Sequence, residues 1–424
     1  MKTVIIVAPQ FAPCSYPPAI RVRFFINHLK EFGWNPIVLT VEPEYMEEPA
    51  DPEFTRMIPE DLEVIRVKAL PPRLTRKIGI GDLGIRCFPY MLKELERICQ
   101  KRQIDALFIP GPPWHTFLLG SIIKQKFNIP FVIDYIDPWV TPGLFYPWKK
   151  AFWFRMMAYL LEPFVIRKVD RITAVSQGTC DTVLQRFPYL NPDIFSVIPY
   201  GCEENDFDFV SKTNRVHKYW NMNDGNLHIC YVGVIWSTAM ETVKSLLDAL
   251  ALLRDSEKEM FDRIQVHFLG TSYTTDAEPQ VLPLAREKGL NNFSELSNRI
   301  PYLDALTVLK SADVILALGS SDTHYTPSKI YPCLLARRPL LGIFHEQSSV
   351  VEVLKEMNTG ILVTYNNNEN PPSSKVKEIA DALIRASGMS VGDSDMMFQE
   401  KFKSYSAYTM AKRLADVFDL AIGG

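Results

Sequence analysis

One short segment of the chain has the residue types that bind phosphate. It reads Thr326-Pro327-Ser328-Lys329 and follows an apolar run and a loop. Thr326 is a favourable helix N-cap and Pro327 suits the first helical position, so we predict that a helix begins here. The N–H groups of Ser328 and Lys329 would then point out of a positively polarised helix end, which attracts anions. The segment therefore predicts a diphosphate site, with a capped helix and one exposed lysine as the plainer alternative.

Two candidate catalytic residues follow other apolar runs. His115 lies in a Pro-rich loop after the run 106–109, where its side chain could hydrogen-bond a ligand. A loop histidine that is satisfied by the backbone is the alternative. Asp137 follows the run 131–133 and precedes Pro138, and its carboxylate could contact a ligand as well. Because an Asp before a Pro is also a standard helix start, the spacing favours capping over catalysis.

Further candidates lie in the first predicted helix and beside the phosphate segment. Arg21 and Pro18 lie at the start of that helix and are candidates for ligand binding, although an arginine at such a position is more often a surface residue. His324 and Tyr325 precede the phosphate segment and could contact the rest of a phosphate-bearing ligand. A solvent-facing loop histidine is the alternative there. Glu346 follows a later apolar run and could reach the same site.

Short apolar runs alternate with longer amphipathic stretches in the first half of the chain. Because the runs are apolar on both faces, they suit a parallel sheet that is covered by helices. The predicted strands are 4–8, 37–41, 64–67, 106–109, 131–133 and 172–175. The predicted helices are 18–32, closed by Gly33, and 116–127 and 179–186. This alternation is typical of a doubly wound α/β domain.

A second series of the same kind follows a polar stretch. Its predicted strands are 227–232, 264–269, 314–318, 340–344 and 361–363, with helices such as 239–253 and 303–310. We therefore predict an α/β protein of two tandem Rossmann-like domains that face each other across a cleft. The predicted N-terminal domain is 1–208 with a crossover helix at about 400–424, the linker is 209–225 and the C-terminal domain is 226–399.

The composition excludes several classes of protein. The chain has 424 residues, 47% of them hydrophobic and 22% charged, and a formal net charge of −3. A nucleic-acid binder usually has a basic excess, so we expect no nucleic-acid partner. The seven cysteines are scattered without a Cys-x-x-Cys pair, which excludes a disulfide framework and the usual zinc spacings. No apolar run approaches the ~20 residues of a membrane span, so we expect a cytoplasmic protein.

Neither half carries a familiar glycine-rich phosphate loop. A G-x-G-x-x-G fingerprint is missing from both strand–loop–helix openings, so an ordinary NAD enzyme is not supported. The P-loop pattern G-x-x-x-x-G-K-[ST] is missing as well, which excludes a P-loop NTPase.

Several stretches, in their order along the chain, resemble retaining GT-B glycosyltransferases of family 4. The donor-site region is carried by SADV at 311–314, YTPSKIY at 325–331 and ARRPLL at 336–341. Earlier stretches agree: PPAIR at 17–21, PPWHT at 112–116, DYIDPW at 134–139, AVS at 174–176, VIPYG at 197–201 and YVG at 231–233. Each motif is weak alone, and the resemblance rests on their order and spacing over most of the chain.

The departures from the family's pattern bear on donor binding. The family's E-x7-E pair would fall on His324 and Pro332, so ribose binding must be done differently here. The loop after Gly233 reads VIWST, without the Arg and Lys that often balance the diphosphate charge. Lys329 then becomes the leading candidate for that charge, with Gly233, Ser328 and Thr326 beside it.

The resemblance implies transfer of a sugar from a nucleoside diphosphate to a glycan or polyprenyl-linked acceptor, with retention and without a metal or cofactor. It implies that His115 bonds a sugar hydroxyl or the acceptor and that Asp137 orients the acceptor. It also implies an acceptor side at Arg21 and Pro18, and contacts to the donor sugar or nucleotide from His324, Tyr325 and Glu346. The oxygen of the leaving diphosphate can take the acceptor proton, so the protein supplies positioning and charge stabilisation. Two alternatives stay open. One is a catalytically weak GT-B subunit that binds or scaffolds, and the other is a GT-B sugar-nucleotide epimerase.

Two segments suit contact with a membrane surface. The stretch 145–171 is rich in Phe and Trp and carries several bases, and Arg73, Arg76 and Lys77 form a second basic cluster near an apolar loop. A helix packed inside the protein is the alternative for the first stretch. A lipid-linked acceptor would make both segments useful, and we therefore expect a protein that is peripheral at the inner face of the plasma membrane.

Overall fold

The structure, a computed structural model, describes residues 1–140, 150–322, 327–389 and 396–423. The chain forms two compact units. The first comprises Met1–Tyr200 and Ala407–Gly424, and the second comprises Gly201–Ser406. The boundary thus falls at Tyr200, earlier than the predicted 208, and the C-terminal segment of the first unit begins at Ala407.

The first unit is built on a seven-stranded parallel sheet in the order β3-β2-β1-β4-β5-β6-β7. Four of its central strands are almost wholly buried, which is why their sequences are apolar on both faces. The strands are β1 (Lys2–Val7), β2 (Trp34–Val41), β3 (Glu63–Val67), β4 (Ala106–Gly111), β5 (Phe131–Tyr135), β6 (Arg171–Ala174) and β7 (Phe195–Val197).

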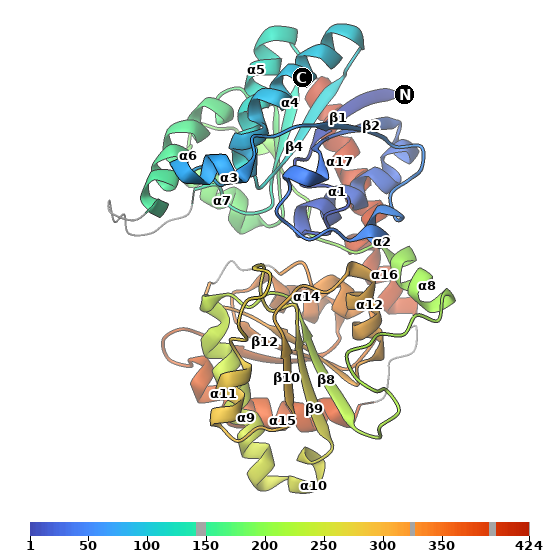
Figure 1. Ribbon diagram of the computed structural model, residues 1–424, viewed down its shortest axis with the longest axis vertical. Helices are drawn as coiled ribbons and strands as arrows, with labels where there is room; N and C mark the ends of the chain where they lie inside the picture. Colours follow the sequence, from blue (N-terminus) through green and yellow to red (C-terminus); the bar gives the residue numbers. More distant parts are fainter. Residues whose placement is uncertain (141–149, 323–326, 390–395, 424) are drawn as a thin grey trace. The chain divides into compact units, whose positions relative to one another are not determined.

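Helices cover both faces of this sheet (Figure 1). They are α1 (Pro17–His28), α2 (Pro52–Thr55), α3 (Pro72–Thr75), α4 (Leu83–Lys101), α5 (Phe117–Phe127), α6 (Lys150–Ile166), α7 (Gln177–Arg186) and α17 (Ala407–Ile422). A 3-10 turn extends α1 to Gly33, whose φ of +82° is the left-handed value that the sequence predicted. Phe418 of α17 packs edge-to-face on Trp34 and Phe108, with centroid distances of 5.0 and 5.6 Å.

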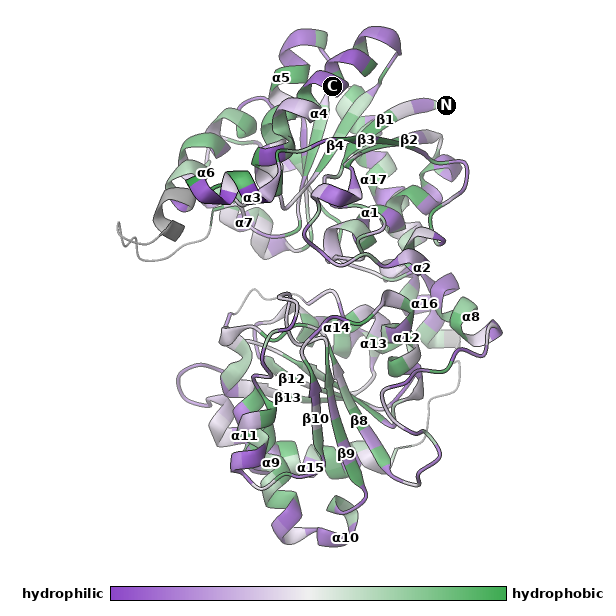
Figure 2. Cartoon of the chain, viewed as in Figure 1, coloured by the Kyte–Doolittle hydropathy of each residue, from purple (hydrophilic) through white to green (hydrophobic). Residues whose placement is uncertain are grey.

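The second unit has a six-stranded parallel sheet in the order β10-β9-β8-β11-β12-β13. Its strands are β8 (Leu227–Val232), β9 (Ile264–Leu269), β10 (Phe293–Leu296), β11 (Val314–Leu318), β12 (Leu340–His345) and β13 (Ile361–Tyr365). Its helices are α8 (Glu204–Lys212), α9 (Met240–Ser256), α10 (Lys258–Phe261), α11 (Leu282–Glu287), α12 (Tyr302–Ser311), α13 (Ile330–Leu335), α14 (Ser349–Met357), α15 (Val376–Ser387) and α16 (Met396–Phe402). Figure 2 shows that apolar residues concentrate in the strands of both sheets.

The predicted fold class is confirmed: both units are Rossmann-like, with strand order reversing at β1/β4 and at β8/β11. The sequence patterns missed β7 and β10, which are short and only partly buried. The predicted linker 209–225 needs correction, because α8 occupies its first residues and buries Val210. Among the described helices, none is both long and apolar enough to cross a membrane.

Candidate functional site

Lys329 lies beside the carboxyl end of β8 in the second unit. Its Nζ donates a hydrogen bond to Tyr231 Oη and lies 3.8 Å from the centroid of the Tyr231 ring. Tyr231 is buried, and its hydroxyl donates in turn to Val234 O at 3.0 Å. An ammonium over an aromatic face is attracted by the ring quadrupole. Lys329 is partly exposed, yet desolvation lowers its pKa to about 7.

Gly233 lies directly against the side chain of Lys329. Its φ of +128° is a conformation that L side chains rarely adopt. A Cβ at this position would lie 3.2 Å from Lys329 Cδ and 3.4 Å from Nζ, so the lysine passes directly over the glycine. Because β8 and β11 are neighbours at the point where the strand order reverses, the loops that follow them meet where folds of this kind bind ligands.

The predicted helix start at Thr326 is wrong. The helix α13 begins at Ile330 and has six residues, and Ser328 and Lys329 lie in the turn before it. A helix of six residues has only a small dipole, so the positive charge available to a diphosphate beside α13 is that of the Lys329 side chain. The candidates His324, Tyr325 and Thr326 lie outside the described residues. Glu346 is exposed directly after β12, on the same carboxyl edge of the sheet.

His115 is buried in the first unit, in the turn after β4. Its Nδ1 lies 3.1 Å from Asp82 Oδ1, and this carboxylate also accepts the N–H of Ile85 at 2.9 Å as the N-cap of α4. The alternative of a backbone-satisfied histidine is therefore wrong, because the partner is a side chain. Nδ1–H donating to Asp82 leaves Nε2 as an acceptor, and this buried atom has no partner among the described residues.

Asp137 lies in the neighbouring loop after β5. Trp114 Nε1 donates to Asp137 O at 3.0 Å, and the His115 and Trp139 rings are 6.0 Å apart, edge to face. These contacts hold the two candidate catalytic residues on adjoining loops at the carboxyl ends of β4 and β5. No described helix starts at Asp137, so the capping alternative has no support there. Asp137 is exposed, yet the protein atoms around its carboxyl group desolvate it enough to raise its pKa above the ordinary value.

The candidate acceptor side at Arg21 and Pro18 is contradicted by burial. The Arg21 guanidinium is 1% exposed and forms an ion pair with Asp134, Nε to Oδ2 at 2.7 Å. Its remaining donors reach Ile198 O at 2.8 Å and Pro199 O at 3.1 Å. With these groups occupied inside the protein, Arg21 ties α1 to β5 and to the segment after β7. Pro18 is also buried, in the first turn of α1.

Two partners in these sites were missed from the sequence. Tyr231 belongs to an apolar strand run, which carries no sign of a cation above its ring. Asp82 does have a local signal, since it is an Asp directly before an amphipathic helix pattern. Its pairing with His115 has no such signal, because the two residues meet only through the packing of α4 against the turn after β4.

No group of three or more metal-ligating side chains that could hold an ion occurs in the described part of the chain. The seven cysteines are all free thiols, and six of them are buried. Burial raises the pKa of the Cys333 thiol, near Lys329, to about 12. Cys333 is therefore not a nucleophile at neutral pH.

Residues 18–201 match the family described as glycosyl transferase 4-like domain. A comparison with curated protein sequences found no match. Among solved structures, a trehalose-phosphate synthase (UDP-forming) from Burkholderia vietnamiensis is similar, with a TM-score of 0.66, 11% identity and 100% of each chain covered. Anabaena Alr3699/HepE in complex with UDP and glucose matches with a TM-score of 0.62, 11% identity, and 99% of this chain and 100% of the other covered.

A third similar structure belongs to another class of enzyme. The UDP-GlcNAc 2-epimerase from Methanocaldococcus jannaschii matches with a TM-score of 0.54 and 14% identity, and 99% of each chain is covered. Likeness at such identities concerns the fold alone. The chain has the two-domain GT-B fold. The match of residues 18–201 to the glycosyl transferase 4-like domain supports a glycosyltransferase.

Proposed function

We propose that the protein transfers a sugar, with retention, from a nucleoside diphosphate sugar to a hydroxyl of a glycan or lipid-linked acceptor. The observation that carries the proposal is the ammonium of Lys329, held over Tyr231 and Gly233 at the reversal point of the second sheet. A cation fixed in a partly desolvated place stabilises the charge that develops on a leaving diphosphate. The UDP and UDP-sugar ligands named for similar structures agree with this ligand class.

The proposed reaction needs no side-chain nucleophile. The bond from the anomeric carbon to the diphosphate oxygen breaks, and the acceptor oxygen forms its bond on the same face. The acceptor proton passes to the departing diphosphate oxygen. Lys329 offsets the negative charge in this scheme, so we expect no metal requirement, and activity in the presence of a chelator tests that expectation.

In the first unit, His115 and Asp137 are the proposed contacts for hydroxyl groups. Asp82 fixes the ring of His115 and directs Nδ1–H away from the ligand, so Nε2 is left to accept a hydroxyl proton in a hydrogen bond. A buried imidazole nitrogen without a partner costs stability unless a ligand satisfies it. We propose that a hydroxyl of the donor sugar or the acceptor does so.

Calorimetry with UDP-, GDP- and dTDP-sugars tests the donor site. The Lys329→Ala variant should bind the preferred donor about 10- to 150-fold more weakly, the range expected for loss of a charged hydrogen bond. The matched control is Lys258→Ala, because Lys258 is an exposed lysine of the same unit on α10. If the wild-type protein binds none of these nucleotides, the proposed function is wrong.

Turnover of the donor separates the proposal from its alternatives. NMR of the sugar released by slow donor hydrolysis should show the donor's anomeric configuration first. An epimerase would instead return a nucleotide sugar with an inverted ring carbon, and a scaffold would bind the donor without releasing sugar. Either result would contradict the proposed transfer.

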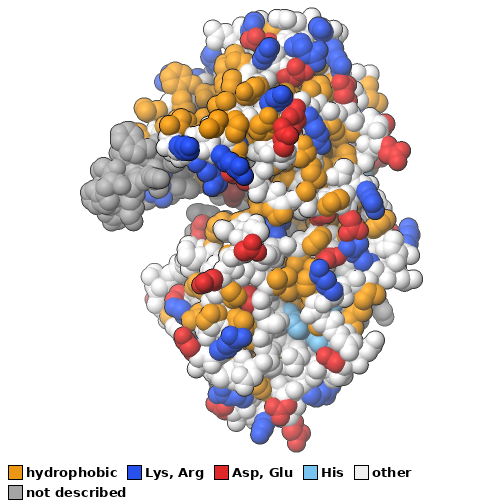
Figure 3. Space-filling model, viewed as in Figure 1, with side chains coloured by type: hydrophobic (Ala, Val, Ile, Leu, Met, Phe, Trp, Pro, Cys, Tyr) orange, Lys and Arg blue, Asp and Glu red, His pale blue; other side chains and the backbone are white. Residues whose placement is uncertain are grey.

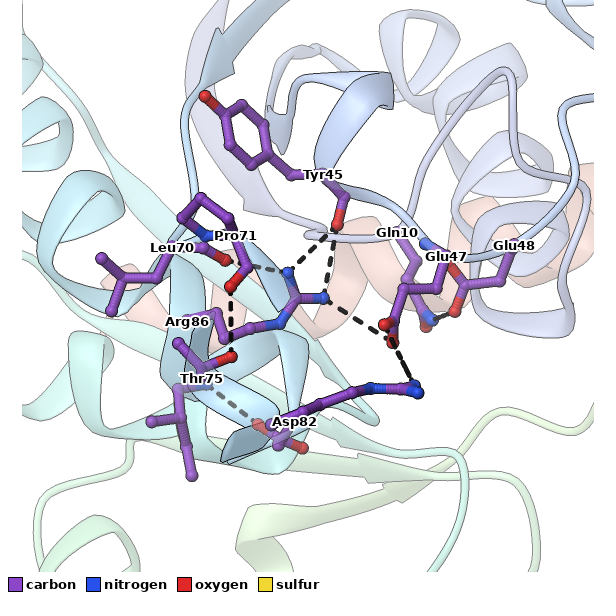
Figure 4. Close-up of polar contacts among 11 residues, drawn as sticks. Gln10, Tyr45, Glu47, Glu48, Leu70, Pro71, Thr75, Asp82 and Arg86 are labelled. Carbon is purple, nitrogen blue, oxygen red and sulfur yellow. Dashed lines mark hydrogen bonds and ion pairs between the residues drawn. The ribbon is translucent and has the colours of Figure 1, made fainter. Parts of the chain in front are cut away.

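A membrane surface is the proposed location of a lipid-linked acceptor. The segment from Leu70 to Ile78 exposes apolar side chains beside three bases, and Figure 3 shows basic and apolar side chains together on this part of the first unit. Arg86 anchors the segment by donating to Leu70 O and Tyr45 O at 3.0 and 3.3 Å (Figure 4). On α6, Met157, Leu160 and Phe164 form an exposed apolar stripe at helical spacing.

Sedimentation with vesicles tests this location. The protein should pellet with vesicles of phosphatidylglycerol and much less with phosphatidylcholine, because bases and apolar side chains act together at anionic surfaces. The Leu74→Ser/Ile78→Ser variant should lose most of this binding. The Leu252→Ser variant, which changes an exposed leucine of the second unit, should keep it. Equal binding by both variants would contradict the assignment.

A further inference from the structure

Three planar side chains gather at the carboxyl edge of the second sheet. Trp236, Tyr273 and Arg299 follow β8, β9 and β10, which are adjacent parallel strands. Parallel strands end at a common edge, so loops far apart in the sequence are brought side by side there. The Trp236 and Tyr273 rings have centroids 5.5 Å apart at an interplanar angle of 46°. Arg299 Cζ lies 5.2 Å from the centroid of the Tyr273 ring.

The loops that carry these side chains are tied to one another. Backbone hydrogen bonds run from Ile235 N to Thr271 O at 3.0 Å and from Ser272 N to Ser297 O at 2.9 Å. The pairing of the three strands therefore continues past their ends. This gives the planar side chains a fixed support, whereas a long free loop would lose entropy whenever a ligand ordered it.

The surface of this cluster is suited to a flat aromatic ligand. Trp236 is 50% exposed, although tryptophan is usually well buried on average. An aromatic face and a guanidinium plane both stack on heterocycles, and Arg adds a cation–π attraction. The hydroxyl of Ser297, two residues before Arg299, is buried and has no hydrogen-bond partner among the described residues. An unsatisfied buried hydroxyl in the same loop suits the polar edge of a heterocycle.

The cluster lies within reach of the diphosphate site. Trp236 is three residues from Gly233, so their Cα atoms are at most about 11 Å apart. Gly233 is the residue over which Lys329 passes. The loop 234–238 contains no Lys or Arg, so its contribution to binding must come from apolar and planar groups.

We infer that the Trp236–Tyr273–Arg299 cluster is the platform on which the base of the nucleotide donor stacks. The inference rests on the proposed function, and it adds the place and the physical basis of base recognition. Stacking on an aromatic face is tolerant of base identity, so the platform provides affinity for any planar base, and selection among bases falls to polar groups at its edge. Lys329 holds the diphosphate and the platform holds the base.

The test compares ligands that contain the base with one that lacks it. Binding of UDP, GDP and inorganic pyrophosphate is measured by calorimetry for the full-length protein and for Trp236→Ala. The nucleotide that binds the wild-type protein best should bind Trp236→Ala about 5- to 140-fold more weakly, the range for one stacked base. Pyrophosphate affinity should stay unchanged. Trp236→Phe should restore most of the nucleotide affinity and Trp236→Leu should not, which guards against a loss caused by misfolding.

A matched control and a second variant separate this inference from the proposed function. Phe209 is 49% exposed in the same unit, so Phe209→Ala removes an aromatic side chain of equal exposure and should bind nucleotide as the wild type does. If Lys329→Ala loses pyrophosphate and nucleotide binding while Trp236→Ala loses neither, the platform is wrong and the proposed function stands. If the wild type binds neither pyrophosphate nor any nucleotide, both are wrong.

Discussion

Removal of the Arg21 side chain should destabilise the first unit strongly, since its guanidinium lies in the interior. Its partner Asp134 is fully buried, and the Asp134 carboxylate accepts from Arg21 Nε at 2.7 Å, from Nη2 at 3.1 Å and from Thr173 Oγ1 at 2.7 Å. In Arg21→Met the apolar chain length is nearly kept, but the carboxylate loses its counter-ion. Two carbonyl groups, of Ile198 and Pro199, lose their donors as well.

The size of the effect follows from this geometry. Breaking a buried ion pair by removing one partner costs about 3–5 kcal/mol, because the other charge is left buried without compensation. For a domain of 150–250 residues, 1 kcal/mol shifts the Tm by about 2–4 °C. A loss of about 4 kcal/mol therefore predicts a fall of about 8–16 °C in the Tm of the first unit.

Differential scanning calorimetry of Arg21→Met measures this shift. The double variant Arg21→Met/Asp134→Leu should recover most of the loss, because a well-packed apolar pair can replace a buried ion pair. The control Arg97→Met removes an exposed arginine that pairs with Glu94 on the same helix, and it should change the Tm by about 1–2 °C or less. A Tm shift below 2 °C together with loss of activity in Arg21→Met would refute the structural role and return Arg21 to the acceptor side.

Three further predictions concern the candidate sites. In Asp82→Asn, an amide replaces the carboxylate that orients His115, so kcat for donor turnover should fall about tenfold or more while the Tm changes little, since Asn also caps helices. Affinity for a nucleotide sugar should fall by up to about tenfold between pH 6 and pH 8, because Lys329, with its pKa of about 7, is charged below pH 7 and neutral above it. Calorimetry across this pH range measures the change in affinity. The Lys329→Arg variant should bind with the same affinity across the range, since Arg stays charged. Gly233→Ala should weaken pyrophosphate binding about tenfold, because the new methyl group meets Lys329 at 3.2–3.4 Å in a strained backbone conformation.

Matched controls exist for two of these variants. Asp51 caps α2 by accepting the N–H of Phe54 and lies away from His115 in the sequence, so Asp51→Asn should leave kcat unchanged. Gly225 has a φ of +78° with open space around its Cβ position, so Gly225→Ala carries the backbone strain without the contact to lysine. Loss of pyrophosphate binding in Gly225→Ala as well would show that strain alone explains the Gly233 result. A flat pH profile in the wild type would contradict the role given to Lys329.

The parallel sheets could be predicted from the sequence because their central strands are buried on both faces. Such strands must be short apolar runs, and the predicted 227–232, 264–269 and 314–318 agree with β8, β9 and β11 to the residue. Edge strands have less apolar surface to bury. β10, with the sequence FSEL, exposes two of its four residues and therefore has no continuous apolar run.

The side-chain pairs in the sites could not be predicted, because they join residues that only the folded chain brings together. Arg21 and Asp134 are 113 residues apart, and His115 and Asp82 are 33 apart. A local pattern cannot show whether an arginine on a helix faces solvent or a buried carboxylate. Lys329, unlike these pairs, has a local sequence signal. It lies between a strand and a helix in the sequence, and this setting predicts ligand binding even though the predicted helix start was wrong.

The two units differ in whether their charged side chains form ion pairs within the protein. The first unit contains two ion pairs with a buried carboxylate: Arg21 with Asp134, and Arg186 with Glu162, which also accepts the hydroxyl of Tyr135 at 2.7 Å. These pairs fix the fold, and their charges are not available to a ligand. In the second unit, Lys329 forms no ion pair with any described residue.

A carboxylate beside Lys329 would hold its charge but would also compete with a diphosphate for it. Tyr231 instead offers a weak, uncharged contact that keeps the lysine in position, while desolvation lowers the pKa of the amine. The arrival of an anion reverses that effect, because an opposite charge close by favours the protonated amine. Because no described residue forms an ion pair with Lys329, the desolvated amine is a cost in the free protein and a source of affinity for a doubly charged ligand. This is the physical reason for the proposal that the diphosphate binds here.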